Sequence, residues 1–271
     1  MCSLVAPDVA KTSHRRTIQK ACVWAGPAMG ALFVVGFVVA GFFPPPSPNQ
    51  SAVQVAAMID AHRTAIRVGI VICLASCPLL MPFLASFTMQ MLRIEGLRPV
   101  LAYTQLALGA LATVEFVIPY VFMLVSTYRA DQHPDVTRAL YDISWFFFLG
   151  VVSTFVLQLA IFGIAVLIDQ RSKPIFPRWL GYVNLWLALT FTPASFLVFF
   201  KTGPLAWNGL LVWWLPVCSF LLWFLPNFVF LLRAIDADDD DDETRLQRLD
   251  RQVASLCERL DALSPGIRTG P

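Results

Sequence analysis

The chain has 271 residues, of which 57% are hydrophobic and only 14% are charged, and its formal net charge is +2. Soluble domains carry about 25% charged residues, so the excess of apolar side chains is expected to face lipid. The lysines and arginines stand singly between apolar runs and form no basic patch, which excludes nucleic acid as a partner. The six cysteines lie mostly within these runs and predict no disulfide framework.

Six long apolar runs predict an all-α, polytopic membrane protein whose main partner is the lipid bilayer. A helix needs about 20 residues to cross about 30 Å of hydrocarbon, and each run reaches that length. We expect the six spans at 21–43, 68–91, 100–126, 143–168, 179–200 and 207–232. The composition divides the chain into a polar segment 1–20, the membrane domain 21–233, an acidic linker 234–244, a coiled-coil-like helix 245–264 and a disordered tail 265–271.

The connection between the first two spans carries clear local signals. Four prolines within residues 44–48 end the first helix, because proline lacks the amide donor. Ser51 is a suitable N-cap for a short helix at the membrane surface that continues over residues 52–67 into the second span. Within the first span, Gly36 and Ala40 lie four residues apart, a spacing that permits close helix approach.

The distribution of basic residues predicts the orientation of the spans. Ten lysines and arginines flank one side of the membrane: Lys11, Arg15, Arg16, Lys20, Arg93, Arg98, Arg171, Lys173, Arg178 and Arg233. Five flank the other: Arg63, Arg67, Arg129, Arg138 and Lys201. Cytoplasmic loops carry the excess of positive charge, so both termini are expected in the cytoplasm and the protein in the cell (inner) membrane.

The C-terminal segment has apolar residues at alternating gaps of three and four, the a/d pattern of a coiled coil. These positions are Leu246, Leu249, Val253, Leu256, Leu260 and Leu263. The pattern favours a homo-oligomer held by this helix, since tails that leave one membrane face meet at high effective concentration. The alternative is an amphipathic helix that packs against its own membrane domain.

Glu115 is the single acid near the middle of the third span, residues 100–126. An acid at that depth costs at least about 2.5–3.5 kcal/mol, and such a residue is a functional hypothesis by default. It predicts a proton relay or an ion-coupling group. The structural alternative is a neutral carboxyl that joins two helices by a hydrogen bond. Polar residues at comparable depth are possible partners: Ser76, Gln158, Thr190 and Ser219.

Two further groups of residues suggest metal chemistry. Outside the membrane, His62, His133 and Asp135 combine imidazole and carboxylate ligands that suit zinc, but no ligand spacing is diagnostic and solvated polar loops are the favoured explanation. Cys73 and Cys77 share one helix face, where neutral cysteines also serve as small apolar residues.

These features favour a small transporter or channel that uses Glu115. The alternative from another class is a membrane scaffold or sensor subunit that clusters through its tail and binds a membrane-protein partner. A lipid-modifying enzyme that uses the outer histidines and aspartates ranks third. The sequence carries no nucleotide-binding, serine-hydrolase or zinc-protease motif, so no cofactor is expected and an enzyme is not favoured.

Overall fold

The computed structural model of the chain describes the backbone of residues 9–263 and the side chains of residues 14–238, 251–253, 255 and 256. The described backbone forms helices and connecting turns, without a strand. Among the described residues, six helical segments are long and apolar enough to cross a membrane: His14–Val39, Arg63–Glu95, Val100–Ser126, Pro134–Ile168, Arg178–Phe199 and Leu210–Asp238. These observations confirm the prediction of an all-α protein with six spans.

The described part of the chain divides into two compact units, residues 22–231 and a second unit formed by the segments on either side of them. In the second unit, α1 (Val9–Val39) and α9 (Leu215–Leu263) are joined by ion pairs. Asp236 accepts Arg16 Nη2 at 2.5 Å and Lys20 Nζ at 2.7 Å.

The backbone of α9 stays helical from residue 215 to residue 263, through the acidic run and the C-terminal heptads. Of the six apolar a/d residues, the side chains of four lie outside the described residues: Leu246, Leu249, Leu260 and Leu263. Val253 is half-buried and Leu256 is exposed. Self-association through these a/d residues therefore stays a prediction.

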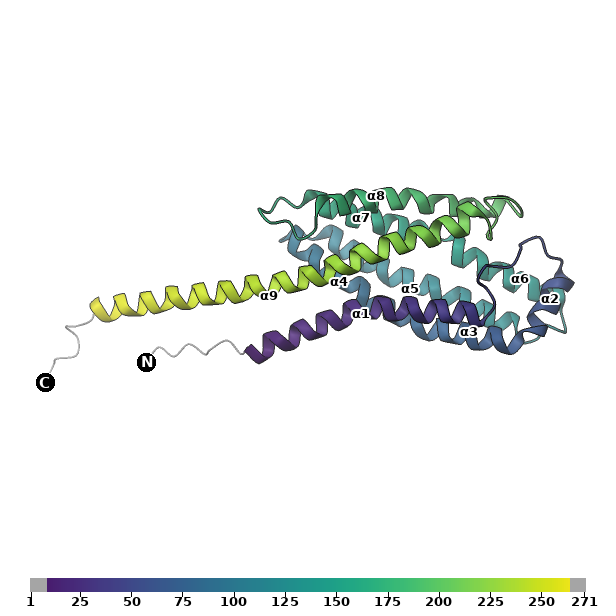
Figure 1. Cartoon of the computed structure of the whole chain (residues 1–271), viewed down its shortest axis with the longest axis horizontal. Coiled ribbons are helices and arrows are strands. Elements are labelled where there is room, and N and C mark those ends of the chain that lie inside the picture. Colours follow the sequence, from purple (N-terminus) through teal and green to yellow (C-terminus); the bar gives the residue numbers. More distant parts are fainter. Residues whose placement is uncertain (1–8, 264–271) are drawn as a thin grey trace. The chain divides into compact units, whose positions relative to one another are not determined.

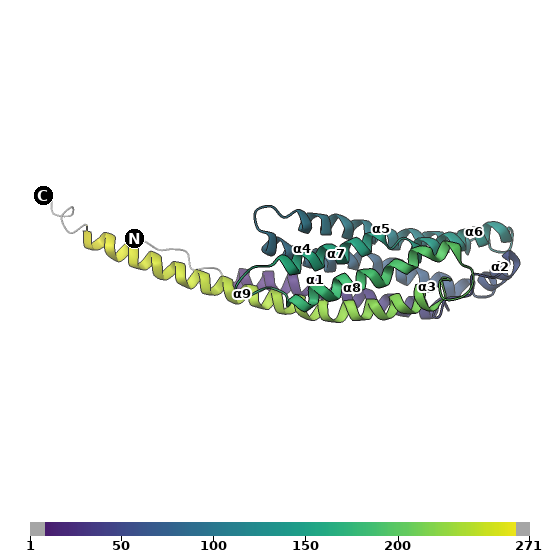
Figure 2. The same cartoon turned by 90° about the horizontal axis from the view of Figure 1, so that it is seen from above.

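In the unit of residues 22–231, α5 packs against four other helices, and these helices run side by side in Figures 1 and 2. The short turns at residues 96–99 and 169–177 lie at one end, here called the base, and the loops at 40–51, 127–133 and 200–209 lie at the other end, the crown. The helices that surround α5 (Val100–Ser126) are α3 (Arg63–Ser76), α4 (Leu80–Glu95), α6 (Pro134–Trp145) and α7 (Ser153–Ile168).

The helix α2 (Ala52–Ala61) begins with the N-cap that the sequence predicts. The Gln54 backbone amide donates to Ser51 Oγ at 3.3 Å, and the Ser51 backbone amide donates to the side-chain Oε1 of Gln54 at 2.9 Å. The two bonds complete a capping box. The prediction that this helix continues to residue 67 is wrong, because it ends at Ala61 and α3 starts at Arg63 after a break at His62.

The helices α1 and α3 cross at small residues. A Cβ atom on Gly36 would overlap the Gly69 carbonyl oxygen and Cys73, and a Cβ on Gly69 would overlap Gly36 and Ala40. The close approach predicted from the Gly36–Ala40 spacing is therefore confirmed. A Cβ on Gly30 would meet no atom within 4 Å, so Gly30 lies outside the close contact between α1 and α3.

The last three spans lose regular α-helical geometry towards the crown. The π-helical segments are η2 (Phe146–Gly150) and η4 (Leu210–Trp214), and the 3-10 segment η3 (Thr192–Phe199) ends the span that begins with α8 (Arg178–Phe191). The segment η3 contacts both η2 and η4, so the irregular backbone of these three spans is gathered in one region. A further 3-10 segment, η1 (Cys77–Leu79), lies between α3 and α4 in the second span. Such geometry within a membrane is tolerated where it is buried in protein or lines a cavity.

Two carboxylates organise the base. Asp169 is 1% exposed and accepts four hydrogen bonds, from Arg171 Nε at 2.9 Å, Arg171 Nη2 at 2.8 Å, the Arg171 amide at 3.2 Å and the Ile175 amide at 3.0 Å. Burial favours a higher pKa for Asp169, but these donors outweigh it and hold the pKa below the ordinary aspartate value. The charged form of Asp169 therefore fixes the turn between α7 and α8.

Glu95 serves as the N-terminal cap of α5 across the turn at 96–99. Its carboxylate accepts the Leu101 amide at 2.8 Å and the Ala102 amide at 2.7 Å, and Pro99, at the N-cap position, provides no side-chain bond. We expect Glu95→Ala to lower the free energy of unfolding by about 0.5–2 kcal/mol, the cost of losing a cap. Thermal unfolding in detergent micelles measures it, and Glu95→Gln, which keeps one acceptor, should lose less. Equal midpoints for wild type and Glu95→Ala would contradict the capping role.

Candidate functional site

The fourth span is broken near the middle of the bundle. Its first half is α6 with η2, and its second half, α7, starts at Ser153 after a non-helical residue, Val151, at φ −87° and ψ 68°. The sequence predicted one uniform span over 143–168, which misses this break. Gly150 followed by two β-branched valines is the local signal, since these residues weaken a helix.

Glu115 lies beside this break. It is part of α5 and is half-buried, and its Oε2 accepts a hydrogen bond from the hydroxyl of Thr154 in the first turn of α7. The N-cap residue of α7, Val152, has no polar side chain to cap the helix. The first turn of a helix carries unpaired amides and a partial positive charge, which favour a carboxylate. The acid thus faces the start of a half-helix inside the membrane domain.

The other polar residues that the sequence placed near Glu115 bind elsewhere. Ser76 Oγ donates to the Cys73 carbonyl at 2.7 Å. Thr190 Oγ1 donates to the Leu187 carbonyl at 2.7 Å and to Ser219 Oγ at 2.9 Å. The donor to Glu115 is Thr154 instead, which sequence reasoning missed.

Gln158, one helical turn after Thr154, is 3% exposed, and neither its Nε2 nor its Oε1 has a hydrogen-bond partner. Burying an unpartnered amide in protein costs about 1–3 kcal/mol. Its role as a polar group beside Glu115 stays a proposal.

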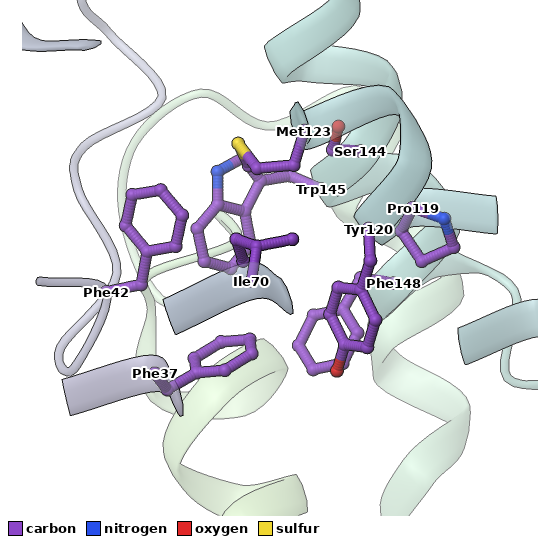
Figure 3. Close-up of a pocket in the computed structure, with 9 residues that line it drawn as sticks. All are labelled: Phe37, Phe42, Ile70, Pro119, Tyr120, Met123, Ser144, Trp145 and Phe148. Carbon is purple, nitrogen blue, oxygen red and sulfur yellow. The ribbon is translucent and has the colours of Figure 1, made fainter. Parts of the chain in front are cut away.

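A small cavity lies on the crown side of Glu115. It measures about 10 Å³, room for a single water molecule, and it is lined mainly by aromatic side chains (Figure 3). Pro119, one turn after Glu115, and Tyr120 contribute to its wall, and the buried Tyr120 hydroxyl has no hydrogen-bond partner. The lining residues are Phe37, Phe42, Ile70, Pro119, Tyr120, Met123, Ser144, Trp145 and Phe148.

A larger groove of about 280 Å³ opens beside the break in the fourth span. Its polar lining consists of the hydroxyls of Ser153, Thr192 and Ser195, and its apolar lining comes from α7 and Val152. Ser153 directly precedes Thr154, so the groove begins next to the residue that hydrogen-bonds Glu115.

The crown loops are joined by an arginine. Arg63 Nη2 binds Asp60 Oδ1 at 2.5 Å and Asp131 Oδ1 at 2.8 Å, so the loops that carry the predicted metal ligands do meet. The hydrogen bond from Arg63 holds the pKa of Asp131 below its ordinary value. These loops therefore carry a solvated ion-pair cluster, in which the Arg63 guanidinium lies between the carboxylates of Asp60 and Asp131.

The predicted zinc ligands have local roles in the structure. His62 Nδ1 lies 3.1 Å from the Met58 carbonyl oxygen, His133 is the N-cap residue of α6, and Asp135 lies in the first turn of that helix. Within the described residues, no three side chains of His, Cys, Asp or Glu are grouped to hold a metal ion. Metal binding by these residues stays a prediction without support from this geometry.

Cys73 and Cys77 are buried free thiols. The Cys77 thiol donates to the Cys73 carbonyl at 3.3 Å, and Cys73 packs against the α1 crossing. They fill space between helices, as neutral cysteines do.

No family model, curated protein or solved structure matches this chain. Six apolar helices with exposed apolar side chains, among them Val34, Leu111, Leu189 and Leu225, define an integral multi-pass membrane protein.

Proposed function

We propose that this protein is a small transporter or channel in which Glu115 binds and releases a proton, or couples the movement of an ion. The observation that carries the proposal is the position of Glu115, on α5, opposite the first turn of α7. The fourth span, to which α7 belongs, is broken at that point. Broken helices whose half-helix ends face a charged group are a recurrent design of ion and substrate sites in transporters.

The surroundings of Glu115 provide for both of its charge states. The Thr154 hydroxyl and the start of α7 stabilise the carboxylate, because donors and a partial positive charge favour negative charge. The apolar side chains of the span stabilise the neutral acid, since desolvation penalises the charged form. A carboxyl that merely joins two helices needs only the neutral state, whereas a coupling group needs both.

The groove beside the break supports the same proposal. Its volume of about 280 Å³ is close to the lower limit of about 300 Å³ for small-molecule sites, and its hydroxyls lie next to the Glu115 donor. We also propose, from the excess of basic residues at the base and in the terminal segments, that both termini face the cytoplasm.

Proton movement in proteoliposomes tests the proposal. With purified protein and an imposed potassium diffusion potential, we expect a proton flux above that of protein-free vesicles. Glu115→Gln, which keeps the shape but cannot ionise, should reduce the flux to the protein-free level while the protein stays monodisperse. Glu115→Asp should keep part of it. A wild-type flux in the Glu115→Gln variant would exclude Glu115 as the coupling group.

The alternative is a membrane scaffold or sensor subunit, and the uninterrupted helix of α9 through the C-terminal heptads favours it. In that case Glu115 is a structural group, and glutamine can replace it because it also accepts a hydrogen bond. Wild-type vesicles without proton flux, together with an unaltered thermal midpoint of Glu115→Gln, would support the scaffold.

A further inference from the structure

Three buried polar side chains without full hydrogen bonding lie between Glu115 and the base. They are Gln158 of α7, with Oε1 and Nε2 unpartnered, Gln105 of α5, with Oε1 unpartnered, and Thr88 of α4, with Oγ1 unpartnered. Their exposed fractions are 3%, 2% and 4%. The three helices pack against one another in every pairwise combination.

These side chains follow one seam. A Cβ on Gly109 would lie 3.4 Å from Gln158 Nε2 and 3.2 Å from Leu84, so α4, α5 and α7 meet at this glycine. Gln105 lies one turn before Gly109 on α5. Thr88 lies one turn after Leu84 on the antiparallel α4, at the level of Gln105, because residues four apart share a helix face.

The seam has the length of half a membrane. From Glu115 to Gln105, α5 advances ten residues, or about 15 Å at 1.5 Å per residue. The hydrocarbon core is about 30 Å thick. Gly109 and Ala112, which lie between them on this face of α5, are buried and small.

We infer that Gln158, Gln105 and Thr88 bind a chain of water molecules between α4, α5 and α7, through which Glu115 exchanges its proton with the base. Buried waters make about three hydrogen bonds each to polar groups that would otherwise be unsatisfied, and these side chains offer both donors and acceptors. The inference rests on the proposed function only for its use in transport, because the water path itself is a property of the seam.

The crown offers the competing route. There the water-sized cavity is lined mainly by apolar and aromatic groups. Its polar groups are the Tyr120 hydroxyl and Trp145 Nε1, both unpartnered, and Ser144 Oγ, which already donates to the Leu140 carbonyl at 2.8 Å. The unpartnered polar atoms around the crown cavity are hydroxyl and indole groups of packed aromatic rings. Gln158, Gln105 and Thr88 instead lie at successive turns from Glu115 towards the base, and this spacing decides the direction.

Hydrogen–deuterium exchange of the Glu115 carboxyl tests the inference. Infrared difference spectra in D₂O follow the C=O band of the protonated acid, which is identified by its loss in Glu115→Gln. We expect Gln158→Met and Gln105→Met to slow this exchange by about tenfold or more, the effect of a small added barrier. Methionine has the length of glutamine without its hydrogen-bonding groups, so folding should be retained.

Two controls fix the interpretation. Asn227→Leu removes another buried amide with an unpartnered oxygen, on α9, and should leave the exchange rate unchanged. Tyr120→Phe removes an unpartnered hydroxyl from the crown cavity and should also leave the exchange rate unchanged. Wild-type exchange in both glutamine variants, or slowing only in Tyr120→Phe, would overturn the inference. The flux measurement on Glu115→Gln is independent, so failure of the proposed function is distinguishable from failure of the water path.

Discussion

The substitution Gly36→Leu is expected to lower the thermal midpoint of the protein by about 6–12 °C. The added side chain would overlap the Gly69 carbonyl and Cys73, and a backbone group cannot rotate away as a side chain can. Overpacking of this kind costs about 3 kcal/mol at its upper range, and each kcal/mol shifts the midpoint by about 2–4 °C in a chain of this size. Thermal unfolding in detergent micelles measures the change.

Gly30→Leu is the matched control, since it lies on the same helix and a Cβ there meets no atom within 4 Å. Both substitutions gain the same helix propensity, about 1 kcal/mol, so the difference between them isolates the crossing of α1 and α3. Similar midpoints for the two variants would show that α1 and α3 are not in contact at this point.

Asp169→Asn should lower the free energy of unfolding by about 1–3 kcal/mol at neutral pH. The substitution leaves the Arg171 guanidinium and the Ile175 amide without their charged acceptor at a site where the side chain is 1% exposed. Asp135→Asn, at an exposed position, is the control and should change the stability by less than about 1 kcal/mol.

The pH dependence of this difference has a definite sign. The pKa of Asp169 is lowered in the folded protein, so its contribution is fully present above the ordinary aspartate pKa of about 3.9 and is lost as the pH falls through the lowered value. The gap between wild type and Asp169→Asn should therefore be constant between about pH 5 and pH 8 and shrink below about pH 4. A gap that widened in acid would contradict this assignment.

The fold could be predicted from composition because lipid sets the length of each span. The third span and its acid follow directly from the sequence, and the capping box at Ser51 follows from local turn chemistry. The helix that carries the fourth span begins at Pro134, nine residues before the predicted span, and a proline at the first helical position is a start signal. The apolar run begins only at about Ile143, so hydropathy alone places the start of the span there.

The candidate site was less accessible to sequence reasoning because it depends on contacts between helices. Ser76 and Thr190 hydrogen-bond carbonyls of their own helices, as short hydroxyl side chains in helices commonly do. Gln158 is too long for that local bond and is left without one. Thr154 acquires its role from the break that precedes it, and Arg63 from a loop 68 residues away.

The irregular segments η2, η3 and η4 also divide the bundle mechanically. Regular helices without proline, such as α7 and α8, resist bending, because each turn is held by successive i to i+4 hydrogen bonds. Segments with π or 3-10 geometry have poorer or displaced bonds and rearrange at lower cost. The crown half of the last three spans is thus the part that rearranges most easily. Glu115 lies where this half joins the stiffer, regular helices.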